Sequence, residues 1–151
     1  MQNRKKRILP LLITVLIMVF IFLQSALPAD LSKEESNMIV QALIEFLHVD
    51  AEFLSFAVRK CAHFTEYLVL GLSLFSTVRE YDPVRLERNE QLRRTALLSW
   101  GIGALYAFTD EVHQAFVPGR SCEIRDMLID SCGVAAGVLI MAALRSCYSK
   151  S

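Results

Sequence analysis

Polar side chains with the capacity for acid–base or phosphate chemistry gather in three short stretches of an otherwise apolar sequence. An Asp or Glu carboxyl beside a His imidazole supplies an acid and a base, whereas Lys and Arg hold the charge of a phosphate or carboxylate. The three stretches therefore predict either a catalytic centre or an anion-binding pocket. The residues are Lys60, His63, Glu66, Tyr67, Tyr106, Asp110, Gln114, Arg120, Asp126 and Asp130.

Each side chain receives a hypothetical role from its chemistry. The candidate catalytic groups are His63, Glu66 and Asp110. No Ser or Cys stands beside an evident base, so hydrolysis would need an activated water. The four cysteines lack the CxxC spacing of zinc sites. No metal or cofactor is expected, although His63, Glu66, Asp110, His113 and Asp130 include groups that can ligate one. The candidate substrate-binding residues are Lys60, Tyr67, Tyr106, Gln114, Arg120, Asp126 and Asp130.

Helical periodicity places the members of each stretch on one face. Asp110 shares its face with Tyr106 and Gln114, whereas Glu111 points roughly a quarter-turn away. We therefore expect Glu111 to pair with a neighbouring helix or to meet lipid head groups. Gly133 and Gly137 follow Asp130 with the spacing that lets helices approach closely in lipid. On this basis Gly137→Leu should disrupt the fold more than Gly119→Ala.

The elements that position these residues are four apolar blocks, at about 8–27, 61–78, 95–117 and 127–144. The first is twenty residues without a charge, which is enough to cross a bilayer. Hydrophobic residues make up 54% of the chain and its mean hydropathy is +0.39, so disorder is excluded. The sequence predicts one all-α domain over 1–151, a membrane bundle of four transmembrane helices.

Two alternatives compete with this interpretation. The block 8–27 follows four basic residues, as a signal peptide does, but signal cores run about 7–15 residues. A soluble bundle of buried helices would show polar faces at helical spacing, which the first block lacks. A nucleic-acid partner is not expected, because 16 basic residues balance 16 acidic ones.

The distribution of Lys and Arg predicts the orientation in the membrane. Eleven of them lie at the N-terminus, in 79–94 and in the C-terminal tail, and five lie in the other connections. Both termini should therefore be cytoplasmic. In this orientation, the polar residues of the second, third and fourth spans all fall within roughly two helix turns of the outer interface. A depth shared by three helices indicates a shared site.

The connections carry further signals. Ser32 and Glu35 form a capping-box pattern that begins an amphipathic helix at about 33–48. Asp50 is placed to cap a helix that runs into the second span. Pro118 and Gly119 predict a turn that folds Arg120 back over the mouth of the pocket, unless Arg120 simply pairs with one of the acids. Cys61 and Cys122 both fall near the outer side, where a disulfide between them is one possibility.

Three of these stretches together resemble the VanZ-like family of bacterial membrane proteins. Residues 59–67 contain K-x-x-H-x-x-E-Y, and 106–120 read Y-A-x-x-D-E-x-H-Q-x-F-x-P-G-R. Residues 126–137 carry Asp126, Asp130 and the two glycines, and 24–28 give a weaker echo. Asp130 stands where the family pattern often has Asn. The resemblance implies a cell-envelope membrane protein linked to reduced susceptibility to teicoplanin-type antibiotics, and it implies no particular reaction.

Three functions are compatible with the sequence. The first is an enzyme acting on an anionic envelope lipid or lipid-linked wall precursor in the outer leaflet, with Lys60 and Arg120 holding phosphate charge. The second is a non-catalytic module that binds such a lipid or a glycopeptide-like ligand. The third is a proton-coupled transporter, which fits less well because the ionisable groups lie at one end of the bundle. The oligomeric state is open.

Overall fold

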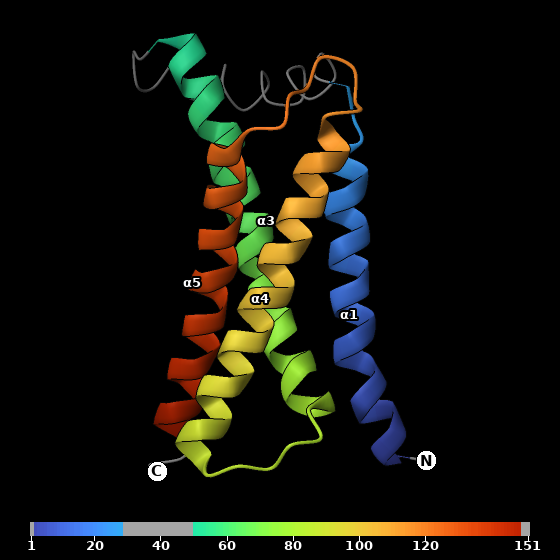
Figure 1. Cartoon of the computed structure of the whole chain (residues 1–151), viewed down its shortest axis with the longest axis vertical. Helices are drawn as coiled ribbons and strands as arrows, with labels where there is room; N and C mark the ends of the chain where they lie inside the picture. Colours follow the sequence, from blue (N-terminus) through green and yellow to red (C-terminus); the bar gives the residue numbers. More distant parts are fainter. Residues whose placement is uncertain (1, 29–49, 149–151) are drawn as a thin grey trace.

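The computed structural model describes residues 2–28 and 50–148, and these form a bundle of four long helices without strands (Figure 1). The predicted amphipathic helix at 33–48 lies outside the described residues. The helices are α1 (Gln2–Ser25), α3 (Ala51–Tyr81), α4 (Arg88–Gln114) and α5 (Ile124–Tyr148). The predicted fold class, an all-α four-helix bundle, is confirmed.

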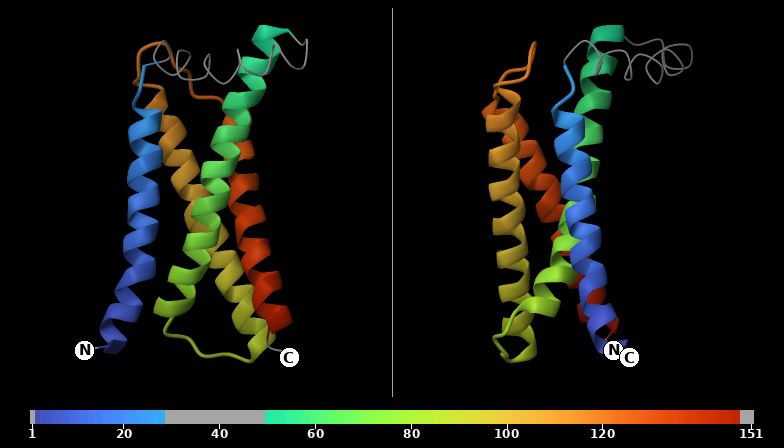
Figure 2. Two further views of the ribbon diagram at one scale, coloured as in Figure 1. Left: turned by 180° about the vertical axis from the view of Figure 1, so that it is seen from behind. Right: turned by 90° about the vertical axis from the view of Figure 1, so that its right-hand side faces the viewer.

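The helices alternate in direction, so that both ends of the described chain lie at the same end of the bundle (Figures 1 and 2). Helix α5 packs most extensively against α3 and also against α4, whereas α1 packs mainly against α3 and meets α4 only briefly. The loop 82–87 connects α3 to α4 at the end that carries the termini. The loop 115–123 connects α4 to α5 at the opposite end, which we call the outer end.

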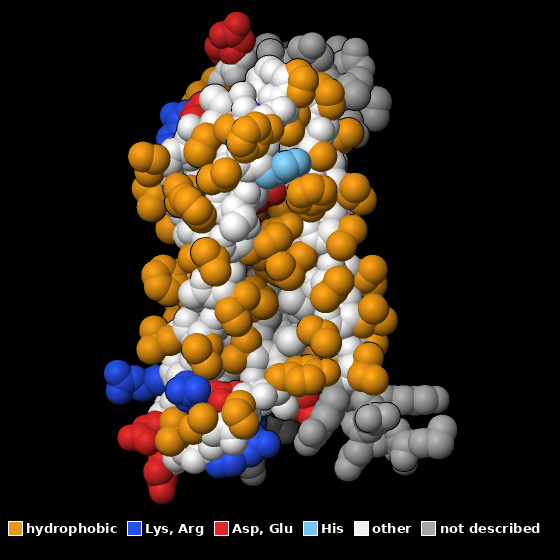
Figure 3. Space-filling view, turned by 45° about the vertical axis from the view of Figure 1, so that its right-hand side comes forward, with side chains coloured by type: hydrophobic (Ala, Val, Ile, Leu, Met, Phe, Trp, Pro, Cys, Tyr) orange, Lys and Arg blue, Asp and Glu red, His pale blue; other side chains and the backbone are white. Residues whose placement is uncertain are grey.

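Within the described residues, three helices are long and apolar enough to cross a membrane: Ile8–Ser25 in α1, Glu52–Tyr81 in α3 and Ile124–Cys147 in α5. Helix α4 has charges at both ends and is not among them, although it runs beside the others along the bundle (Figure 1). On the face that Figure 3 shows, hydrophobic side chains cover the middle and charged ones gather near the ends. A multi-pass membrane protein fits this surface, and α4 as a fourth span remains a prediction.

Glycines set the closest approach in the bundle, between α3 and α5. A Cβ at Gly133 would lie 2.5 Å from the Phe64 carbonyl oxygen. A Cβ at Gly137 would overlap the Leu68 carbonyl oxygen and lie 2.9 Å from the Leu72 nitrogen. The stripe predicted from sequence is therefore a backbone-to-backbone contact. Helices approach this closely in lipid because association there depends on van der Waals packing instead of water exclusion.

Hydroxyl groups attach the inner half of α1 to α3. The Oγ1 of Thr14 lies 2.7 Å from Ser73 Oγ and 2.8 Å from Thr77 Oγ1, and it also donates to the Pro10 carbonyl. Thr14 is 3% exposed. A polar contact of this kind fixes the depth of one helix relative to another, because a slip would leave hydroxyls unsatisfied in hydrocarbon.

Helix α3 is longer than the predicted span and begins before it. Asp50 caps it as predicted, because its carboxylate accepts a hydrogen bond of 3.4 Å from the Glu52 N–H. At the other end, Asp82 accepts from the Val84 N–H at 3.0 Å and from Arg94 Nε at 2.8 Å. These bonds hold the pKa of Asp82 below its usual range. The carboxylate therefore orders the turn that leads into α4.

The glycine contact predicts opposite effects of one substitution at two sites. Gly137→Ala should lower the free energy of unfolding by roughly 1–3 kcal/mol, because the methyl group has no room between the backbones. Gly101→Ala should raise it by up to about 1 kcal/mol, because nothing lies within 4 Å of a Cβ there and Ala favours helix. Thermal unfolding in detergent measures both. Equal stabilities would contradict close packing of α3 and α5.

Gly101 is also a better control than Gly119, which we named above. Gly119 has φ of 77°, a left-handed conformation in which any side chain is strained. Ala at Gly119 would therefore destabilise the protein for a reason unrelated to helix packing.

Candidate functional site

A polar pocket of about 280 Å³ opens at the outer end of the bundle, between the start of α3, the end of α4, the 115–123 loop and the start of α5. Five of the candidate residues meet in it, from three segments that are distant in sequence. Basic side chains outnumber acidic ones in its lining. The lining residues are Phe56, Arg59, Lys60, His63, Gln114, Gly119, Arg120, Ser121, Glu123, Arg125 and Asp126.

The charges of this outer pocket are only partly neutralised. Lys60 Nζ forms an ion pair with Asp126, and Arg125 pairs with Glu123 at 2.9 Å. Arg59 has no hydrogen-bond or ion-pair partner in the described part of the chain. The Nδ1 of His63 is likewise buried without a partner there. The pocket thus presents a cation and an imidazole nitrogen that no described residue engages.

Arg120 is positioned by a type II turn. The Arg120 N–H donates to the Val117 carbonyl at 3.1 Å, with Pro118 and Gly119 as the central residues and Gly119 at positive φ. The predicted Pro-Gly turn is present. Arg120 lines the outer pocket, as expected, but its guanidinium is bonded to the end of α1. Its Nε donates to the Leu27 carbonyl at 2.9 Å and one terminal nitrogen donates to the Gln24 carbonyl at 3.3 Å. Carbonyls at a helix C-terminus favour such a cation.

Asp110 lies just beneath the pocket and connects three segments. Its Oδ1 accepts from the Ser25 hydroxyl at 2.5 Å, and its Oδ2 accepts from Gln114 Nε2 at 3.1 Å. The Oε1 of Gln114 in turn accepts from Arg120 at 3.2 Å. Asp110 is 3% exposed and Ser25 is fully buried. This chain of bonds, which we call the Asp110 network, joins α1, α4 and the 115–123 loop. Arg120 forms no ion pair with Asp110 or Asp126.

Tyr67 and Asp130 lie deeper in the bundle, where both are almost completely buried. Neither carboxylate oxygen of Asp130 has a hydrogen-bond partner in the described part of the chain, and the Tyr67 hydroxyl also lacks one of suitable geometry. Both residues lie close enough to Asp110 for its charge to act on them. A buried polar group without a partner costs free energy, so no stabilising contact within the described part of the chain accounts for the Asp130 carboxylate.

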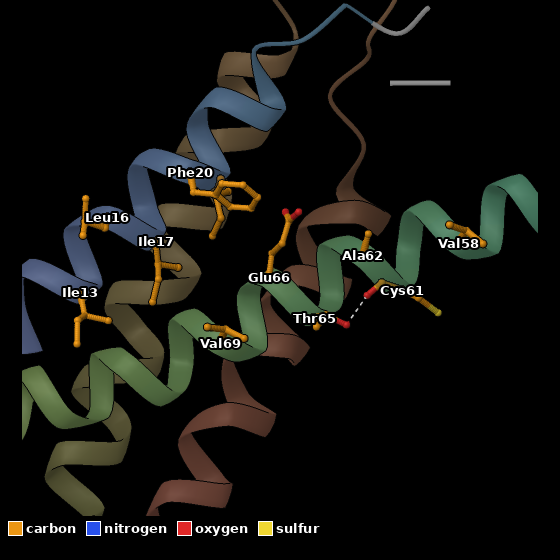
Figure 4. A pocket seen from close by; sticks show the side chains of 11 residues that line it. Ile13, Leu16, Ile17, Phe20, Val58, Cys61, Ala62, Thr65, Glu66 and Val69 are labelled. Carbon is orange, nitrogen blue, oxygen red and sulfur yellow. Dashed lines mark hydrogen bonds between the residues drawn. The ribbon is translucent and has the colours of Figure 1, made fainter. Parts of the chain in front are cut away.

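Glu66 faces a different compartment from His63. It lines a groove of about 690 Å³ between α1 and α3, in which the surrounding side chains are almost all apolar (Figure 4). Ile13, Ile17 and Phe20 form the α1 side of this groove, and Val69 contributes to the α3 side. Because the groove lies at the depth of the membrane-spanning segments, we call it the lipid-facing groove.

The other conspicuous residues of α4 contact α1 or the loop. The Tyr106 hydroxyl donates to the Met18 carbonyl at 2.6 Å, and the His113 ring stacks on Phe22 with centroids 4.5 Å apart. Glu111 is 1% exposed and accepts a hydrogen bond of 3.0 Å from the Glu123 N–H. Glu111 was expected to pair with a neighbouring helix or to meet head groups; its partner is instead the 115–123 loop, just before α5 begins.

The structure thus divides the predicted set. Lys60, His63, Gln114, Arg120 and Asp126 line the outer pocket. Asp110, Tyr67 and Asp130 are buried below it, Tyr106 contacts α1, and Glu66 lines the lipid-facing groove. A single pocket holding all ten residues is therefore not what the fold builds.

A comparison with protein-family models decides the family. The model described as VanZ/LLP1 matches residues 10–145, nearly the whole chain. The chain belongs to the VanZ/LLP1 family. No curated protein and no solved structure matches it. Membership in the VanZ/LLP1 family is consistent with a cell-envelope membrane protein linked to reduced glycopeptide susceptibility, and the helices described above are those of a membrane protein.

Sequence reasoning missed Ser25 as a partner of Asp110, because the two residues are 85 positions apart. The statement that no Ser lies beside an evident base is therefore wrong. The weaker family-like stretch at 24–28 was the available signal, because it contains Ser25. All four cysteines are free and exposed, so Cys61 and Cys122 do not pair. No group of three or more potential metal ligands occurs among the described residues.

Asp130 and Asp126 should respond in opposite ways to loss of charge. Asp130→Asn removes a buried carboxylate without a partner, so the free energy of unfolding should rise by about 1 kcal/mol. Asp126→Asn leaves Lys60 without its ion pair and should lower the free energy of unfolding by about 1 kcal/mol. Chemical or thermal unfolding in one detergent compares the two. A destabilised Asp130→Asn protein would show that the carboxylate has a favourable partner in solution.

Proposed function

We propose that this VanZ/LLP1 protein binds the anionic head group of an envelope lipid, or of a lipid-linked wall precursor, in its outer pocket. The observation that carries the proposal is the excess of basic side chains around a pocket at the outer end of the bundle, where Arg59 has no carboxylate partner among residues 2–28 and 50–148. Arg120 adds to this field, because its bonds go to carbonyl oxygens and to Gln114 and leave its charge in place.

The lipid-facing groove provides a place for the chain of the same lipid. Its walls are apolar, it lies between α1 and α3 at membrane depth, and an acyl or isoprenoid chain is the apolar partner that the bilayer supplies. Glu66 is the carboxylic acid in its lining, and it lies close enough to Asp110 and Arg120 for their charges to act on it. A lipid lying against α3 in this way reaches polar protein groups at one end and hydrocarbon along the rest.

The geometry supports binding better than catalysis. His63 lines the outer pocket, whereas Glu66 lines the groove and Asp110 is buried with its oxygens engaged by Ser25 and Gln114. The two candidate catalytic acids, Glu66 and Asp110, therefore do not line the cavity that His63 lines, although general acid–base chemistry requires acid and base within reach of the substrate. Proton-coupled transport is supported less, since the ionisable groups do not continue along the bundle.

The orientation belongs to the same proposal. Both ends of the described chain lie at one end of the bundle, and the Lys and Arg excess at that end supports a cytoplasmic location for it. The outer pocket then opens at the outer leaflet, where envelope lipids and wall precursors are exposed.

Arg59 offers a direct test of head-group binding. Arg59→Gln should reduce the anionic lipid that copurifies with the full-length protein about fivefold, because one unpaired cation is lost from the pocket. Arg93→Gln makes the same change at the opposite end of the bundle and should leave this lipid unchanged. Mass spectrometry of extracted lipids measures both. Undiminished retention by Arg59→Gln would contradict the proposal. Asp110-dependent turnover of a defined lipid in cells would identify an enzyme instead.

Asp110 and Glu111 should differ although they are adjacent. In Asp110→Asn, the new amide nitrogen is a donor and faces another donor, either the Ser25 hydroxyl or Gln114 Nε2. If the Gln114 amide turned to offer its oxygen instead, it would lose the hydrogen bond that this oxygen accepts from Arg120. In Glu111→Gln, an oxygen can still accept from the Glu123 N–H. Asp110→Asn should therefore abolish lipid retention and any effect on teicoplanin susceptibility, whereas Glu111→Gln should retain most of both. An Asp110→Asn protein that folds and functions normally would exclude a role for the Asp110 network.

A further inference from the structure

We propose that a second cavity, at the end of the bundle that carries the termini, binds a phosphate group. This inner cavity has a volume of about 580 Å³ and lies between the end of α3, the start of α4 and the end of α5. It is separate from the outer pocket and independent of the function proposed for it. Its lining residues are Arg79, Glu80, Arg85, Leu86, Arg88, Gln91, Leu92, Thr95 and Arg145.

Four arginines surround the inner cavity, and all four are exposed. Arg79 lies close enough to Arg88 and Arg145 for their like charges to repel. No ion pair in the described part of the chain joins a carboxylate to any of these three. Arg88 is instead held by the Ser146 carbonyl at 2.8 Å, which fixes its position without neutralising it. A bound anion with two or more acceptor oxygens would relieve this repulsion.

The inner part of the cavity carries hydrogen-bond donors that the protein leaves unused. The Oε1 of Gln91 accepts from the Leu86 N–H at 3.2 Å, which orients the amide. Its Nε2 is consequently directed elsewhere and is buried without a partner in the described part of the chain. Thr95 is 1% exposed, and its hydroxyl oxygen also lacks a partner there. Two buried donors beneath a ring of arginines are the complement of a phosphate.

The start of α4 also favours an anion in the inner cavity. Its N-cap residue, Glu87, makes no side-chain capping bond, so the first amides of the helix are left without that partner. The amides and the helix dipole favour an anion near this end. The inside-positive distribution of charge accounts for arginines at this end of the bundle, but it does not account for the buried Gln91 and Thr95 donors beneath them.

The chemistry fits a phosphate diester or monoester, from either an inner-leaflet anionic phospholipid or a soluble phosphate compound. Basic pockets between helices on the cytoplasmic side bind phospholipid head groups in this manner. Both sources present the same oxygens to the arginines, and they differ in whether the phosphate arrives from the membrane or from water.

Two arms of one experiment distinguish the sources, both using the full-length protein in nanodiscs. In the first, phosphatidylcholine discs are titrated with inorganic phosphate and thermal unfolding is followed. In the second, phosphatidylglycerol is added to the discs, and lipid retained by the protein is measured by native mass spectrometry. Stabilisation in the first arm, or selective retention in the second, supports the site and names its source. No effect in either arm overturns it.

Matched variants make the result specific to this cavity. Arg79→Gln should weaken binding about fivefold or more, as expected for loss of a charge-assisted contact. Arg93→Gln removes the same charge from the same end but outside the cavity, and should change binding less than about twofold. Equal weakening of binding by both variants would show that positive charge at this end attracts phosphate without a specific site, and would overturn the proposal. If Arg79→Gln does not fold, Thr95→Val decides, since it deletes a buried hydroxyl at constant shape, and unchanged binding by it overturns the proposal.

Discussion

The short hydrogen bond between Ser25 and Asp110 is the interaction on which the outer half of the bundle depends. Asp110 is buried at the end of α4, and its carboxylate is satisfied by Ser25 from α1 and by Gln114 from its own helix. Gln114 extends the contact to Arg120, which binds the last carbonyls of α1. One acid thus determines where α1 ends, how the 115–123 loop folds and where a guanidinium stands at the outer interface. In hydrocarbon, such a group must be satisfied by protein, so these positions are tightly specified.

The remaining helix contacts are of two physical kinds. Helices α3 and α5 approach through Gly133 and Gly137, with backbone against backbone and no polar bond required. Helix α1 is attached by directional bonds at three depths: Thr14 to α3, Met18 to Tyr106 of α4, and Ser25 to Asp110. The first kind excludes lipid between the helices. The second leaves lateral space, and the lipid-facing groove lies in that space, between α1 and α3.

The sequence was sufficient for the fold and for part of the site, for identifiable reasons. Uncharged blocks and the uneven distribution of Lys and Arg can be read from local composition. The helices, and the placement of both chain ends at the same end of the bundle, could therefore be predicted. The Pro118-Gly119 turn and the Asp50 cap depend on a few adjacent residues, and both were predicted.

The rotation of one helix against another depends on packing across the bundle. That is why Glu66 was grouped with His63, although it faces the groove, and why the contact from Ser25 to Asp110 was missed. The inner cavity was also missed, because its Gln91 and Thr95 look like ordinary polar residues of α4.

The attachment of α1 has a consequence for how the protein assembles. Among the described residues, α1 makes no helix contact with α5, whereas α3, α4 and α5 contact one another in every pairing. Those three form a closed unit whose glycine seam can be completed before α1 arrives, as two-stage assembly in membranes allows. Helix α1, although first along the chain, can then dock after the other three. Its hydroxyl and carbonyl groups act as a register, accepting only the rotation and depth at which Thr14, Met18 and Ser25 all find their partners together.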